Sequence, residues 1–153
     1  MGAAPSPRWF GVLHLSGLGI CLSLAAALQG SPVVFVPVTE FTLAWTHSIE
    51  KVRWEEDYAV RLDAASGQPV LHAVQARVRG SAAGMEPPFD AVLRHGWYQY
   101  TPAITTPSGL RLTRSEFTPD YETCVPGRCQ PMANWMASDG GVTLLKACRQ
   151  PTR

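Results

Sequence analysis

Residues 41–51 read Phe-Thr-Leu-Ala-Trp-Thr-His-Ser-Ile-Glu-Lys, and this stretch decides the fold. Phe41, Leu43 and Trp45 alternate with small or polar residues, which is the period of a strand with one buried face. His47 continues the apolar face, so a buried imidazole there would need a hydrogen-bond partner. The stretch therefore predicts a half-buried strand that ends in polar side chains.

The polar end of this strand admits two interpretations. Ser48 and Glu50 fall where the chain turns, because a second alternating segment begins near Val52. In one interpretation His47, Ser48 and Glu50 form a binding cluster at the strand end. In the other, His47 is satisfied by a backbone group and its neighbours are solvated turn residues. The sequence leaves both open.

Further alternating segments follow this strand. Residues 53–62 and 70–79 alternate, and the turn signal Ser66-Gly67 separates them, so we expect a meander of three strands. Shorter strands are predicted at 33–38, 91–93, 96–100, 110–114 and 142–147. Residues 118–131 carry three prolines and are expected to be irregular, and 132–136 fit one helical turn. These segments predict an all-β fold, a small antiparallel β-sandwich or a barrel-like meander.

Length and charge restrict the function. A chain of 153 residues fits one domain, and 46% hydrophobic with 16% charged residues fits a folded chain. The formal net charge is +1 and no basic run is present. Nucleic-acid binding and polybasic attachment to lipid both need a cationic surface, so neither is expected.

The N-terminal segment is apolar. Residues 9–28 contain no charge, Arg8 precedes them, and small residues follow. This pattern is typical of a signal peptide cleaved near Ala27 or Gly30, or of an uncleaved anchor helix that spans the bilayer. We therefore predict a leader at 1–30 and a single β domain at 31–153, placed in the periplasm or otherwise outside the cytoplasm. Membrane contact is expected only through an uncleaved leader.

The cysteines predict a disulfide in an oxidising compartment. Cys21 falls in the predicted leader, which leaves three cysteines in the domain. Cys124 and Cys129 enclose a Pro-Gly turn and are the favoured pair, which leaves Cys148 unpaired. Pairing of Cys148 with Cys124 or with Cys129 is the alternative.

A glycine-containing loop interrupts the strands at 80–90. Small residues lead to Met85 and Glu86, and two prolines follow and stiffen the segment. The loop either presents Met85, Glu86 and Asp90 to a ligand or connects the sheets.

Known catalytic and metal-binding patterns are weak in this chain. His47, Glu50 and Glu86 could supply a metal or small-ligand site, but no His-Glu-x-x-His pattern is present. A hydrolase triad of Ser48, His47 and Asp90 is disfavoured, because adjacent strand residues point to opposite faces. We expect no catalytic residues, no metal and no cofactor.

Three segments carry a family resemblance. Residues 41–51, the Trp-Glu-Glu-Asp-Tyr at 54–58 and Gly84-Met85-Glu86 resemble the domain of unknown function 1850 family. The chain has Ala82 where the family usually has the first glycine of a Gly-Ala-Gly-Met loop. The resemblance implies a short exported or membrane-anchored protein, often encoded beside TAXI-type TRAP transporters, which import organic anions.

From this resemblance we expect a non-enzymatic extracytoplasmic accessory protein that binds the transporter's membrane subunit or its solute-binding protein. A metal- or small-ligand-binding module that uses His47, Glu50 and Glu86 is the alternative, with a hydrolase as a further one. The residues expected to bind the ligand or partner are Thr46, His47, Ser48, Glu50, Glu55, Glu56, Gly84, Met85 and Glu86.

Overall fold

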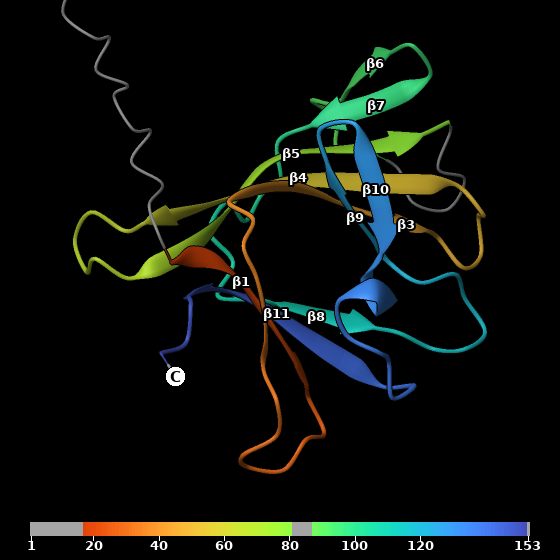
Figure 1. Ribbon diagram of the computed structural model, residues 1–153. Helices are drawn as coiled ribbons and strands as arrows, with labels where there is room; N and C mark the ends of the chain where they lie inside the picture. The colour runs from red at the N-terminus through yellow and green to blue at the C-terminus, as the bar shows by residue number, and fades with distance from the viewer. Residues whose placement is uncertain (1–16, 81–86, 153) are drawn as a thin grey trace, which may run out of the picture.

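The computed structural model describes residues 17–80 and 87–152. These residues form eleven strands and one short 3₁₀ helix, arranged in two antiparallel sheets (Figure 1). The predicted all-β class is confirmed. Within the described ranges, no helix is long and apolar enough to cross a membrane.

The larger sheet has seven strands. Its centre is the predicted meander of β3 (Glu40–Thr46), β4 (Arg53–Leu62) and β5 (Pro69–Arg79). The register between β4 and β5 shifts between Asp57 and Tyr58, where Val74 of β5 has no partner on β4. The outer strands are β9 (Glu122–Val125) and β10 (Arg128–Pro131) beyond β3, and β7 (Trp97–Tyr100) and β6 (Val92–Arg94) beyond β5.

The smaller sheet has four strands in the order β2, β1, β11, β8. Their bounds are Val34–Val36, Leu18–Leu24, Val142–Arg149 and Leu110–Thr113. The predicted strand at 33–38 is β2, which lies at the edge of this sheet and, among the described residues, pairs with β1 alone. β1 pairs with β2 on one side and with β11 on the other, so it lies inside the sheet.

Strand β1 lies within the segment 1–30 that was predicted as a leader. Leu18, Ile20 and Leu22 are buried in the core, and Cys21 forms a disulfide with Cys148. A cut near residue 27 or 30 would remove this strand, so the β domain begins by residue 18 rather than at 31. The prediction that Cys148 is unpaired is wrong. The earlier part of the predicted leader, including Arg8, lies outside the described residues.

The segment 118–131 is more regular than its prolines predict. Residues 122–131 form the β9–β10 hairpin, and Pro126-Gly127 is its turn, with Gly127 at φ +80°. Proline at the turn removes no ladder hydrogen bond, and glycine tolerates the positive φ. The predicted helical turn is confirmed as a 3₁₀ helix at Met132–Asn134.

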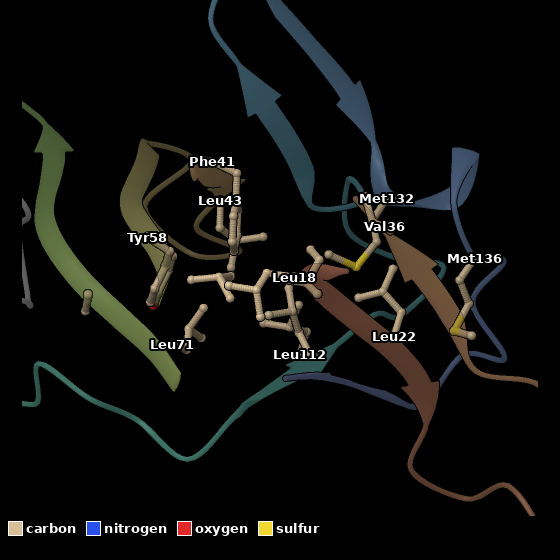
Figure 2. Packing of buried hydrophobic residues seen from close by; sticks show 14 residues of the cluster. Leu18, Leu22, Val36, Phe41, Leu43, Tyr58, Leu71, Leu112, Met132 and Met136 are labelled. Carbon is tan, nitrogen blue, oxygen red and sulfur yellow. The ribbon is translucent and has the colours of Figure 1, made fainter. Parts of the chain in front are cut away.

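The core lies between the two sheets (Figure 2). Leu18, Leu22 and Val36 of the smaller sheet pack with Phe41 and Leu43 of the larger one. Further along β3 and β4, the inner face carries larger, partly buried residues. The candidate site lies beside these partly buried residues, at the edge of the core.

Candidate functional site

A groove of about 380 Å³ lies at the C-terminal end of β3. One side comes from the end of β3 and the turn after it, and the other from the segment that follows β8. We call it the signature groove, and its lining residues are Trp45, Thr46, His47, Ser48, Thr113, Ser115, Thr118, Pro119 and Tyr121. These residues are mainly aromatic or hydroxyl-bearing, and none is lysine, arginine, aspartate or glutamate.

The aromatic wall of the groove consists of the lining residues Trp45, His47 and Tyr121, with Trp54 packed against the first two. The rings of Trp45 and Trp54 stack at 6.0 Å between centroids, because the two residues pair directly across β3 and β4. Tyr121 lies 5.9 Å from Trp45, and His47 lies 6.2 Å from Trp54. Aromatic pairs at these distances stabilise the fold by more than the burial of their surface area alone. The groove therefore has a preformed aromatic wall.

His47 stabilises the turn beside the groove. Its Nδ1 accepts hydrogen bonds from the backbone N–H groups of Glu50 at 3.2 Å and Ile49 at 3.4 Å. Its backbone closes the turn through His47 N–H to Val52 O at 2.9 Å and Lys51 N–H to His47 O at 3.0 Å. Since Nδ1 is an acceptor here, the ring proton sits on Nε2 in the neutral form. His47 thus both holds the turn and lines the groove.

The adjacent acids Glu55 and Glu56 point to opposite faces of the sheet. Glu55 lies on the outer face, where it accepts from Arg53 at 2.7 Å and from Arg77 at 2.6 Å. Arg77 also contacts Asp57 at 2.7 Å. Partial burial opposes the charge of Arg77, but its bonds to these carboxylates outweigh burial and raise the pKa of Arg77.

This outer-face network crosses β3. Arg53 on β4 donates to Glu122 on β9 at 2.6 Å, so its side chain passes over the intervening strand. Ala44 pairs in register with both Glu55 and Glu122, and it is fully buried although it belongs to the outer face. The salt bridges therefore cover Ala44 of β3. The charge of Glu55 is neutralised by Arg53 and Arg77 within the protein.

Glu56 lies on the inner face, near the aromatic wall. The hydroxyl of Tyr58 donates a hydrogen bond to its carboxylate. Burial, together with that hydrogen bond, raises the pKa of Tyr58 well above its usual value. Burial and the charge of Glu56 also raise the pKa values of Tyr100 and Tyr121. Tyr58 therefore contacts this carboxylate directly, and its charge also acts on Tyr100 and Tyr121.

The predicted site residues divide among these places. Thr46, His47 and Ser48 lie together in the groove, Glu50 lies in the adjoining turn, and Glu55 faces away. Gly84, Met85 and Glu86 lie outside the described residues, so their relation to the groove stays a prediction. The second side of the groove was missed, because residues 113–121 approach β3 only through long-range folding.

The predicted disulfide between Cys124 and Cys129 is confirmed, with an S–S distance of 2.04 Å. Together with Glu122 these cysteines form a group of metal-ligating residue types within the described ranges. Both sulfurs are in the disulfide, so neither is a thiolate that binds metal. The group therefore lacks the ligands of a metal centre.

Comparison with known families now adds to this geometry. A model of the domain of unknown function (DUF1850) matches residues 41–132. The chain belongs to this family. The DUF1850 match runs from β3 to the 3₁₀ helix and includes every residue that lines the signature groove. No curated protein and no solved structure matches the chain.

Proposed function

We propose that this DUF1850 protein is a non-enzymatic extracytoplasmic accessory protein that binds a partner protein in the signature groove. The proposed partner is the membrane subunit or the solute-binding protein of a TAXI-type TRAP transporter. The observation that carries the proposal is a preformed aromatic groove with two exposed apolar residues beside it.

Those apolar residues favour a protein partner. Ile49 is 80% exposed and follows Ser48 in the chain, while Phe117 is 87% exposed and precedes Thr118. Both are immediate chain neighbours of residues that line opposite sides of the groove. Exposed apolar residues beside a concave surface are typical of interaction sites, and aromatic residues dominate the energy of such interfaces.

The chemistry of the groove also argues against the transported anion as its ligand. An organic dicarboxylate is normally recognised by arginine or lysine, because paired N–H donors match the carboxylate. None of the nine lining residues carries such a cation. A polypeptide segment fits better, since hydroxyls can bond its backbone and aromatic rings can cover its side chains.

The disulfides are consistent with an oxidising compartment outside the cytoplasm. We propose the periplasm or an equivalent space as the location. Delivery there requires an export signal, and we propose that the segment before β1 supplies it.

Co-purification tests the proposal. The protein is co-expressed with the TAXI-type transporter subunits of its own organism and isolated through a tag on the transporter. We expect Ser48→Trp, which fills the groove, to abolish co-elution. Thr106→Trp places the same side chain at an exposed threonine that does not line the groove, and it should have no effect. Absence of co-elution with the wild type, or equal co-elution of Ser48→Trp, would contradict the proposal.

A further inference from the structure

Glu56 carries a charge that the described protein does not neutralise. It is half-buried on the inner face of β4, yet among residues 17–80 and 87–152 it takes part in no ion pair. The neighbouring acids Glu55 and Asp57 are both paired with arginine on the outer face. The stretch 81–86 contains no basic residue in the sequence.

A carboxylate in this position is costly without a partner. Withdrawing an ionised group from water is unfavourable unless hydrogen bonds or an opposite charge compensate it. Tyr58 supplies one hydrogen bond. A carboxylate accepts several more, and no other side chain among residues 17–80 and 87–152 donates one to Glu56, so a donor from a ligand fits there.

Aromatic residues lie near Glu56 on the same face of the sheet. The register places Glu56 beside Leu43 of β3 and Ala76 of β5, and Ala76 pairs with Tyr100 of β7. Two residues along β4 lies Trp54, which stacks on Trp45 of the groove wall. Tyr121 lines the groove, and its ring lies 5.9 Å from that of Trp45. The aromatic wall therefore continues from the groove towards the carboxylate.

We propose that Glu56 and the aromatic residues near it form a subsite for one cation, the ammonium or guanidinium group of a lysine or arginine side chain of the partner. This inference rests on the proposed function and specifies its partner. The carboxylate pairs with the cation, and the faces of the tryptophan and tyrosine rings attract it through their quadrupoles. The apolar stem of a lysine or arginine suits the aromatic wall, since such stems pack on apolar surface while the charged head finds a polar partner.

Short peptides test the subsite. The probes are acetyl-Ala-Lys-Ala-amide and acetyl-Ala-norleucine-Ala-amide, which share a similar stem but differ in charge. Binding is followed by tryptophan fluorescence, because Trp45 and Trp54 lie in the wall. We expect the wild type to bind the lysine peptide about tenfold more tightly than the norleucine peptide, a ratio that one ion pair with an aromatic contact can supply.

Two variants locate the effect. Glu56→Gln keeps an acceptor for Tyr58 but removes the charge, and we expect the lysine preference to disappear. Glu40→Gln removes the same charge from an exposed residue of β3, and the preference should remain. If Glu56→Gln does not fold, the lysine preference of the wild type is measured at increasing salt concentration instead. The lysine preference must then fall as ionic strength rises, because salt partly screens an ion pair at a half-buried carboxylate.

The outcomes separate this inference from the proposed function. Equal binding of both peptides, or an unchanged preference in Glu56→Gln, overturns the cation subsite even if Ser48→Trp still blocks co-purification. Absence of saturable binding by either peptide also overturns it. If free butylammonium binds as tightly as the lysine peptide, the subsite serves a small amine and the assignment to a partner side chain is wrong.

Discussion

The disulfide between Cys21 and Cys148 should contribute far more stability than the one between Cys124 and Cys129. The first joins β1 to β11 with a sequence separation of 127 residues, whereas the second closes a hairpin with a separation of 5. The perturbation is the removal of each bond in turn, through the double variants Cys21→Ala/Cys148→Ala and Cys124→Ala/Cys129→Ala.

The magnitudes follow from the loop sizes. Chain-entropy reasoning assigns about 5 kcal/mol to a loop of the longer size and about 2 kcal/mol to the shorter one. The expected difference is therefore about 3 kcal/mol. Each kcal/mol lost from the free energy of unfolding lowers Tm by about 3 °C in a chain of this length. The expected losses in Tm are therefore about 15 °C without the Cys21–Cys148 bond and about 6 °C without the Cys124–Cys129 bond. Both cysteines of the longer bridge are half-buried, so their truncation adds only a small cavity cost.

Equilibrium unfolding in urea without reductant measures both losses. Far-UV circular dichroism follows the sheets, and free-thiol titration of the wild type verifies that both bonds are formed. A loss for the Cys21/Cys148 variant that is equal to or smaller than that of the hairpin variant would refute the reasoning. It would mean that β1 is not held in the domain as described.

Three further predictions concern stability, each measured by urea unfolding. Ala44→Leu should cost about 1–3 kcal/mol, because the larger side chain displaces Arg53 from its path over β3; an unchanged midpoint contradicts that path. His47→Ala should cost about 1 kcal/mol through loss of the Nδ1 acceptor, and His47→Asn should restore part of it, whereas equal losses contradict a capping role. Asp120→Asn should cost about 3–5 kcal/mol, because it breaks the bidentate pair with Arg114. The two hydrogen bonds of that pair measure 2.8 and 3.0 Å, and Arg114 is only 3% exposed. A loss of stability below about 1 kcal/mol would contradict this.

Local alternation was sufficient to predict most of the larger sheet. The predicted 53–62 strand is β4 residue for residue, because its side chains follow the period of two, although Tyr58, Ala59 and Val60 are all buried. β1 was misread for a physical reason. It is a buried inner strand in a long uncharged run, and such a run resembles a leader or an anchor in composition. Only its pairing with β11 and the disulfide to Cys148 distinguish the two.

One side of the candidate groove could be found from the sequence. The polar end of β3 was singled out as a candidate site, and Thr46, His47 and Ser48 lie together in the groove, whereas their role stays a prediction. The opposite roles of Glu55 and Glu56 follow from strand alternation, yet the resemblance placed both in one site. Tyr121 could not be found locally, because it reaches Trp45 only when β9 pairs with β3 across a long sequence separation.

Binding of a lysine side chain beside the signature groove is tested most directly by the indole N–H signals of the tryptophans in a nuclear magnetic resonance titration with the lysine peptide. We expect the signals of Trp45 and Trp54 to shift together and to saturate. The signals of Trp97, which lies under Arg79, and Trp135, which follows the 3₁₀ helix, should stay in place. Shifts confined to Trp97 or Trp135, or no saturable shift of Trp45 and Trp54, would contradict binding of a lysine side chain beside the groove.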